Sequence, residues 1–349
     1  MNDLSTERRY GFTTAIVRDG LTFTDVEDAC EISVHGVFLS DGKYRRLPEQ
    51  VARDTNDGVY RLHTHTAGGR IRFRTDSPYI AIHIVYNTID KFPHFPLTGS
   101  AGLDLYRNNV YIGSYIPTLE ITDTYEGIID LPNSTEADFT LNMPLYSGVS
   151  KIYIGIKESA SLCKASPYTL DLPVVYYGSS ITQGACASRP GNSYQSILSR
   201  ELNIDYINLG FSGSARGEQA ISDYIASLKM SAFVLDYDHN APTVEHLKAT
   251  HKNLYDNVRK AHPTLPILML SRPKFHLTEE EKLRLEVVRE SYLSAIADGD
   301  RSVYFIPGNE LIEYRCAECA LVDNCHPGDS GFVSMAFSIL PTLKKMLKF

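Results

Sequence analysis

The hydrophobic pattern of this chain changes its period once, near Pro167, and this change restricts the fold more than any other feature. Before that point apolar and polar residues alternate, and the isoleucines of the segment 151–157 all fall on one face. The segments 70–74 and 139–143 alternate in the same way. A period of two is typical of half-buried strands with one solvated face. No amphipathic helix is apparent there, so this part predicts an antiparallel β-sandwich, for example of the jelly-roll type.

After Pro167, short apolar runs alternate with segments of helical length. This repetition predicts an α/β fold, a doubly wound parallel sheet with helices on both faces. Because 349 residues exceed the usual size of a single core, we expect two domains, 1–166 and 167–349. The predicted strands span residues 173–177, 204–208, 232–236, 265–270 and 302–306, and the predicted helices span residues 193–202, 218–229, 244–261, 279–297 and about 330–347.

Charge and hydropathy exclude two classes of partner. The formal net charge is -8, and no dense stripe of Lys and Arg is present, so nucleic acid is not an expected ligand. No apolar stretch approaches transmembrane length, and the first 17 residues lack the apolar run of a signal peptide. We therefore expect a cytoplasmic protein without a membrane span, or a secreted one if a leader was removed. The oligomeric state stays open.

The six cysteines are too sparse for a disulfide framework. Cys316, Cys319 and Cys325 lie close together in the sequence, which is compatible with zinc binding. A structural zinc site needs four ligands, however, and the obvious fourth, His326, has a better use that is described below. We expect neither a metal nor an organic cofactor.

A second pair of potential metal ligands is found in the N-terminal part. His63 and His65 alternate along a predicted strand and would share one of its faces. Paired histidines at this spacing sometimes bind a metal, but no third ligand accompanies them. A solvated sheet face is the expected environment.

Polar residues stand where the strands of the predicted parallel sheet end. The loops after the carboxyl ends of such strands share one edge of the sheet, and ligands bind at that edge. A serine hydroxyl there needs an adjacent base, the base needs an orienting partner, and hydrogen-bond donors must meet the oxyanion. The pattern therefore indicates acyl transfer. The polar segments are Gly178-Ser179-Ser180-Ile181, residues 208–213, Tyr237-Asp238-His239-Asn240 and Asp323-Asn324-Cys325-His326.

At these four segments the sequence resembles the SGNH hydrolases, also called GDSL esterases and lipases, across about residues 170–349. The resemblance implies a flavodoxin-like sheet and a catalytic triad in which Ser180 is the nucleophile, His326 the base and Asp323 the orienting acid. It also implies an oxyanion hole formed by the backbone N–H groups of Ser180 and Gly213 and by the side-chain amide of Asn240.

Two positions depart from the family pattern. Ser179 replaces the aspartate of the nucleophile block, and Asp238 replaces the glycine expected two residues before Asn240. Neither residue belongs to the implied triad. The chain carries a Gly-Ser-Ser-Ile-Thr block that follows an N-terminal β-domain. In this it resembles the subgroup that includes esterases of sugar esters and of other small acyl esters.

Several neighbouring residues have structural explanations that compete with functional ones. Gly328-Asp329-Ser330-Gly331 resembles a chymotrypsin-type nucleophile motif, but the surrounding α/β pattern does not fit two β-barrels. Asp329 and Ser330 are therefore expected to begin the closing helix. Asn240 could also cap the helix that begins near Thr243. A loop histidine with satisfied hydrogen bonds is the expected state of His239, whereas for Arg216 and Cys186 the sequence leaves substrate contact open.

The sequence thus predicts a serine esterase that hydrolyses small acyl esters, with an acetylated carbohydrate or related polar alcohol as its substrate. Two alternatives use the same residues differently. An acyltransferase would pass the acyl group to another hydroxyl, and a glycan-binding protein would carry an inactive hydrolase domain. The N-terminal β-domain is expected to form one wall of the active-site cleft.

Overall fold

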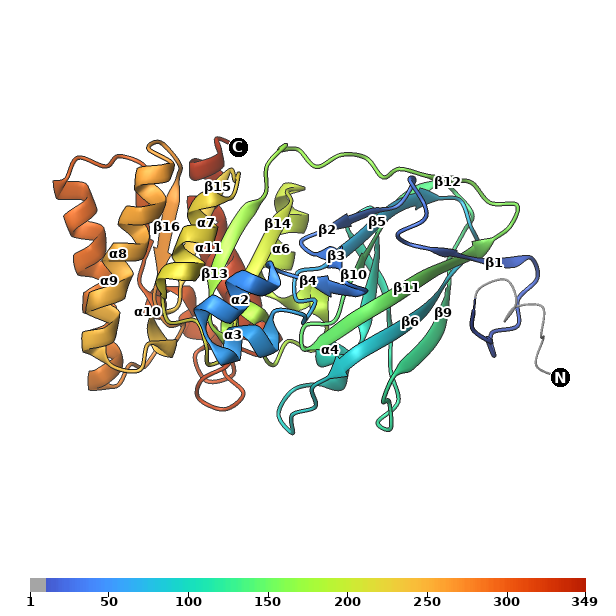
Figure 1. The fold of residues 1–349 in the computed structure, drawn as a ribbon, viewed down its shortest axis with the longest axis horizontal. Coiled ribbons are helices and arrows are strands. Elements are labelled where there is room, and N and C mark those ends of the chain that lie inside the picture. The colour runs from blue at the N-terminus through green and yellow to red at the C-terminus, as the bar shows by residue number, and fades with distance from the viewer. Residues whose placement is uncertain (1–10) are drawn as a thin grey trace.

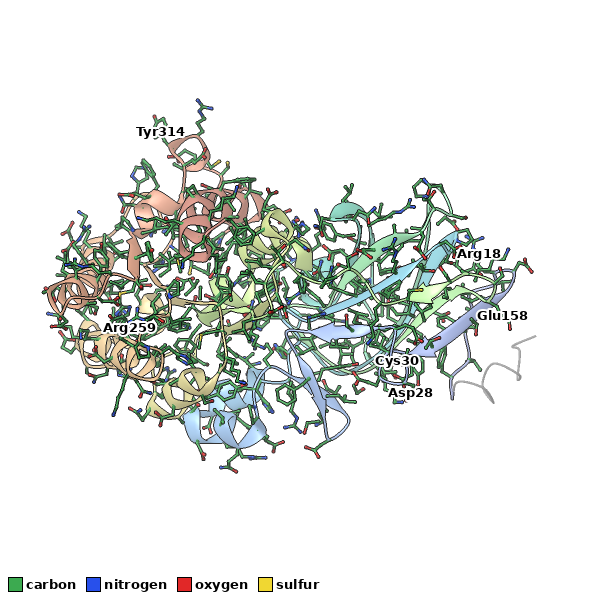
Figure 2. The ribbon with its side chains drawn as sticks, turned by 90° about the horizontal axis from the view of Figure 1, so that it is seen from above. Arg18, Asp28, Cys30, Glu158, Arg259 and Tyr314 are labelled. Carbon is green, nitrogen blue, oxygen red and sulfur yellow. The ribbon has the colours of Figure 1, made fainter. Side chains whose placement is uncertain are left out.

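The computed structural model describes residues 11–349 and contains two halves that lie end to end (Figure 1). Residues 1–10, which entered the targeting prediction, lie outside the described part. In the view from above, Arg259 marks the α/β half and Cys30 marks the sandwich half (Figure 2). The N-terminal sheets are antiparallel and the C-terminal sheet is parallel, so the predicted fold class is confirmed.

Two antiparallel sheets form the N-terminal half, with strand orders β1-β11-β6-β9 and β12-β5-β10-β7-β8; β2 pairs with β5. Their inner faces share one apolar core, in which Ile71, Phe73, Ile82 and Ile152 are fully buried. The bounds are β1 Leu21–Asp25, β2 Ser33–His35, β5 Arg70–Thr75, β6 Tyr79–Ile89, β7 Leu103–Arg107, β8 Val110–Tyr115, β9 Thr124–Asp130, β10 Ala137–Asn142, β11 Ser147–Lys157 and β12 Leu162–Cys163, with a separate hairpin of β3 Phe38–Ser40 and β4 Lys43–Arg45.

The C-terminal half has a five-stranded parallel sheet of order β14-β13-β15-β16-β17, so β13 lies where the order reverses. Alternate residues of β13 enter different layers: Val174 and Tyr176 pack with α6 and α11, and Val175 and Tyr177 pack with α7, α8 and α9. The strands are β13 Val174–Gly178, β14 Tyr206–Gly210, β15 Ala232–Asp236, β16 Ile267–Leu270 and β17 Val303–Ile306. The helices are α5 Ser180–Gln183, α6 Tyr194–Leu202, α7 Gln219–Ser227, α8 Val244–Ala261, α9 Glu279–Ala297, α10 Gly308–Leu311 and α11 Asp329–Leu347, with 3-10 turns η1 Pro190–Asn192, η2 Asp238–Asn240 and η3 Tyr314–Cys316.

Three short helices interrupt the N-terminal half, where none was predicted: α2 Glu49–Thr55, α3 Asp57–Leu62 and α4 Leu97–Ser100. The first two join the core of the α/β half, where Ala52 and Val59 are fully buried. Both are visible beside α7 in Figure 1. The domain boundary at residues 166 and 167 stays a prediction, because these two helices pack with the second half.

The predicted shared strand face of His63 and His65 is wrong. His63 follows the last residue of α3 and contacts the carbonyl of Tyr60 through Nδ1. His65 is buried, and its Nδ1 is 3.2 Å from the side-chain nitrogen of Gln183. The two rings therefore have separate buried surroundings, because the chain turns out of a helix between them.

Buried arginines join the two halves. Arg70 on β5 stacks on the ring of Tyr206 with 3.8 Å to the ring centroid, and it also pairs with Asp205. Arg46 donates hydrogen bonds to backbone carbonyls, including that of Gly210 at the end of β14. The expectation of a solvated face for segment 70–74 is wrong at Arg70, which is 2% exposed because the second half covers it.

Within residues 11–349, no helix combines the length and the apolar character that crossing a bilayer requires.

Candidate active site

Ser180 stands at the sharp turn from β13 into α5. Ser179 is the N-cap of α5, and its hydroxyl accepts a hydrogen bond from the N–H of Ile181 at 3.1 Å. A side chain at Gly178 would approach the carbonyl oxygen of Asp236 to 2.1 Å, so the turn requires glycine there. The β-strand thereby delivers Ser180 to the carboxyl edge of the sheet.

His326 and Asp323 reach the same edge from the loop before α11. The hydroxyl oxygen of Ser180 lies 2.8 Å from Nε2 of His326, and Nδ1 of His326 lies 2.8 Å from Oδ2 of Asp323. The second carboxylate oxygen, Oδ1, accepts from the backbone N–H groups of His326 and Cys325, at 2.8 and 3.1 Å. One carboxylate therefore orders the loop and the imidazole together.

Opposing effects set the proton affinities of this pair. Burial lowers the pKa of His326, but contacts with Cys325 and Asp323 raise it more, so the net pKa is above the ordinary value. The Asp323 contact is the stronger support, because the sulfur of Cys325 is 3.9 Å from Nε2. Burial raises the pKa of Asp323, but its hydrogen bonds to His326 lower it below the usual range. A charged Asp323 beside a basic imidazole is the arrangement that accepts a proton from a hydroxyl.

Gly213 and Asn240 lie in the loops after β14 and β15, the two strands that flank β13. Gly213 has a φ of +67° and open space where a side chain would stand, which favours glycine and leaves its backbone accessible. The Asn240 amide donates to the carbonyl of Phe211 at 3.1 Å, so it ties the two loops together and retains a second N–H. Asn240 does not cap α8, since Thr243 fills that position. The donor roles remain predictions.

The second departure from the family pattern also has a local explanation. The buried carboxylate of Asp238 accepts from the N–H of Arg272 at 3.1 Å and contacts Nδ1 of His239 at 2.9 Å. It thereby fixes the loop beside Asn240. Nε2 of His239 is buried and has no hydrogen-bond partner in the described part of the chain, whereas Arg216 is exposed.

The loop of residues 90–96 brings side chains from the sandwich half to this edge. The ring centroids of His94 and Phe95 lie 5.9 and 6.0 Å from the ring centroid of His326. Nε2 of His94 is 3.8 Å from Oδ2 of Asp323. The N-terminal half therefore contacts the imidazole directly, in line with the predicted wall.

Aromatic packing holds this loop in place. The ring centroids of Phe95 and Phe92 lie 4.7 and 5.8 Å from that of Tyr146. The hydroxyl of Tyr146 donates to the carbonyl of Ser180 at 3.3 Å. Sequence reasoning missed these residues. The signal was the run Phe-Pro-His-Phe-Pro at 92–96, in which aromatic residues are concentrated in a loop between strands.

Ser330 has a structural role. It is the second residue of α11, and its hydroxyl donates to the carbonyl of Cys319 at 2.7 Å. Among residues 11–349, neither Cys316 nor Cys319 belongs to a group of three potential metal ligands, whereas Cys325 lies near Asp323 and His326.

Two family models match the chain. Residues 171–344 match the GDSL-like lipase/acylhydrolase family, and residues 21–162 match the N-terminus of Esterase_SGNH_hydro-type proteins. No curated protein matches the chain.

Several solved structures share both halves. A protein designated a GDSL-like lipase from Bacteroides ovatus is 28% identical, with 94% of this chain and 98% of that chain covered and a TM-score of 0.84. A salicylyl-acyltransferase from a tetracycline biosynthetic pathway is 19% identical, with 95% and 98% covered and a TM-score of 0.76. A family two carbohydrate esterase from Clostridium thermocellum, in complex with cellohexaose, is 16% identical, with 81% and 94% covered and a TM-score of 0.63. The last two likenesses establish the fold alone.

Proposed function

Because the chain belongs to the GDSL-like lipase/acylhydrolase family and is a carboxylic ester hydrolase, we propose that it cleaves small acyl esters through an acyl-enzyme on Ser180. The observation that carries this proposal is the unbroken contact from Ser180 through His326 to Asp323, with 2.8 Å at each step. A hydroxyl, an imidazole and a carboxylate in this order are the machinery of nucleophilic acyl transfer.

In the first step, the hydroxyl oxygen of Ser180 attacks the ester carbonyl and its proton passes to Nε2 of His326. Collapse of the tetrahedral intermediate expels the alcohol, which takes that proton from His326. Water then gives a proton to the same nitrogen and attacks the acyl-enzyme. The second collapse releases the carboxylic acid and returns the proton to Ser180. Asp323 stays ionised throughout and stabilises the imidazolium.

The tetrahedral oxyanion would be bound by the N–H groups of Ser180 and Gly213 and by the amide of Asn240. The support is that all three stand at the carboxyl edge of neighbouring strands, and that Asn240 keeps one amide hydrogen free of its bond to Phe211. Preorganised donors of this kind contribute most where charge develops.

For the substrate we propose an acetyl ester of a carbohydrate or a related polar alcohol. The structural neighbours include carbohydrate esterases and an acetyl xylan esterase from Butyrivibrio proteoclasticus. Acyl transfer to an acceptor alcohol is the second candidate, because the comparison with the salicylyl-acyltransferase covers 95% of this chain.

The test is hydrolysis of p-nitrophenyl acetate by a Ser180→Ala variant. We expect turnover and labelling by a fluorophosphonate to disappear while the thermal midpoint is unchanged, because only a hydroxyl oxygen is removed. Ser330→Ala is the matched control and should keep full activity. Near-normal turnover in Ser180→Ala would reject the proposal. Product analysis with and without an added alcohol separates hydrolysis from acyl transfer.

A further inference from the structure

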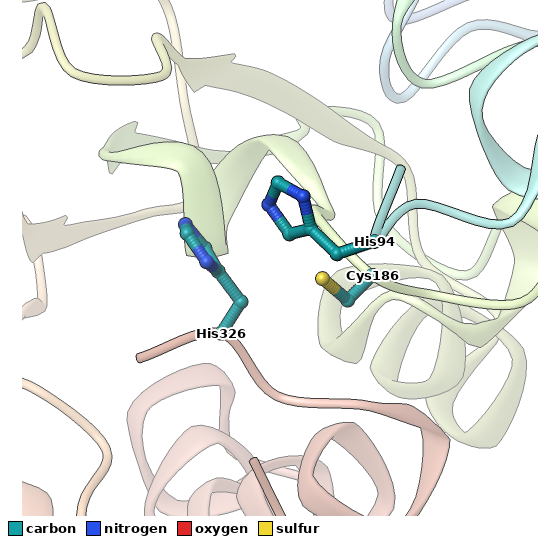
Figure 3. A group of neighbouring side chains, drawn as sticks. All are labelled: His94, Cys186 and His326. Carbon is teal, nitrogen blue, oxygen red and sulfur yellow. The ribbon is translucent and has the colours of Figure 1, made fainter. Parts of the chain in front are cut away.

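We propose that His94, Cys186 and His326 form a binding site for a soft divalent cation such as Zn²⁺, and that its occupation switches the hydrolase off. One potential ligand atom from each residue lies within 4.8 Å of the other two (Figure 3). The inhibition rests on the proposed function, since it requires His326 to be the base. The binding itself does not.

The separations are close to those of a metal centre. Zinc lies about 2.0–2.1 Å from nitrogen and about 2.3 Å from sulfur, so ligand atoms of a tetrahedral site are about 3.3–3.7 Å apart. The three atoms therefore need to approach one another by no more than about 1.5 Å. The side chain of His94 is 36% exposed on a loop, which leaves room for its ring to turn toward the other two. Cys186 is held by its buried position next to α5.

The ligand set selects the class of metal. Two imidazoles and one thiolate suit zinc and other soft or borderline cations, whereas magnesium and calcium prefer carboxylate and carbonyl oxygens. Binding converts the Cys186 thiol to a thiolate, and the displaced proton passes to solvent. Three protein ligands leave a fourth position for water, and Asp323, only 3.8 Å from Nε2 of His94, lies close enough to supply an alternative ligand.

Occupation is incompatible with the contacts of His326. If the metal takes Nε2, Ser180 loses the atom that accepts its proton. If it takes Nδ1, the hydrogen bond to Asp323 is lost and the imidazole loses its orientation. Both cases remove the base from catalysis. The site also connects the two halves, because His94 belongs to the sandwich half and the other two ligands belong to the α/β half.

The experiment measures zinc binding and zinc inhibition separately. Calorimetry on Ser180→Ala, with reduced cysteines and no chelator, should give one Zn²⁺ per chain. Co²⁺ at the same site should show a sulfur-to-cobalt charge-transfer band. In the protein with Ser180 intact, Zn²⁺ should abolish p-nitrophenyl acetate turnover, and a chelator should restore it.

The variants His94→Gln and Cys186→Ser each remove one ligand and leave the proposed triad intact. Loss of even an outer-shell partner costs about 10–100-fold in metal affinity, so each variant should weaken binding and inhibition by about 100-fold or more. Cys30 is an exposed cysteine on the sandwich half (Figure 2). The control variant Cys30→Ser should change neither the zinc affinity nor the inhibition.

The outcomes separate the two proposals. Unchanged zinc affinity in both ligand variants, or a cobalt complex without a sulfur band, would overturn the site. Activation by zinc would overturn the switch. If Ser180→Ala remains active as an esterase but still binds zinc through His94 and Cys186, the site stands and the proposed function falls.

Discussion

The two oxygens of Asp323 have separate tasks, and Asp323→Asn distinguishes them. Oδ1 accepts from two backbone N–H groups, so an asparagine can keep its own oxygen there and preserve the loop. Its NH₂ group then replaces Oδ2 opposite Nδ1 of His326. An NH₂ group can only donate, so Nδ1 must become the acceptor and Nε2 must carry the hydrogen. The imidazole is then in the tautomer that cannot take a proton from Ser180.

A wrong tautomer in an intact triad costs about 10⁴-fold in kcat, or about 5.5 kcal/mol of transition-state stabilisation. We expect a loss of this order for Asp323→Asn with p-nitrophenyl acetate near neutral pH. The thermal midpoint and the far-ultraviolet circular dichroism should match those of the unaltered protein, because both loop hydrogen bonds remain.

Glu318→Gln is the control, since it changes the same charge in the same loop on a side chain that is 93% exposed. It should leave kcat unchanged. A loss of less than about tenfold in Asp323→Asn would refute the claim that this carboxylate orients the base. Equal losses in both variants would show that the charge of the loop, and not its contact with His326, governs the rate.

Three further perturbations test other parts of the structure. Asn240→Ala should lower kcat by about 10²–10³-fold if its amide binds the oxyanion, and an unchanged kcat would remove it from that role. In the unaltered protein, kcat/KM should fall as the pH decreases through the pKa of His326, because the protonated ring cannot accept a proton. The raised pKa of His326 puts this transition above about pH 6.5. A pH profile with a lower midpoint would contradict this prediction. Arg46→Met should reduce the free energy of unfolding by at least about 3 kcal/mol in urea, because it leaves carbonyls such as that of Gly210 without their donor, and a stability equal to that of the unaltered protein would contradict this reading.

The regular elements of the α/β half were predictable because their signals are local. Helices α8 and α9 match their predicted ranges residue for residue, and each is preceded by a threonine that caps it. Thr278 and Glu281 also form a reciprocal capping box. The order of polar residues at strand ends likewise needed no distant information, and the structure brings Ser180, Asp323 and His326 together.

What the sequence could not reveal depends on contacts between the two halves. Helices α2 and α3 span seven and six residues, which is too few for a clear helical period. They are stabilised by burial against core residues that lie more than a hundred positions further along the chain. The alternating pattern predicts that Arg70 is solvated, but Tyr206 and Asp205 of the second half pack against it and bury it. The approach of His94 to His326 has the same origin.

The guanidinium of Arg46 reaches from the sandwich half to the carbonyl that ends β14, three residues before Gly213. A separated α/β fragment would thus have an unbraced loop at the very place where negative charge is expected to develop. Recombining this catalytic half with a foreign β-module should yield active chimaeras only when the donor brings an equivalent cation.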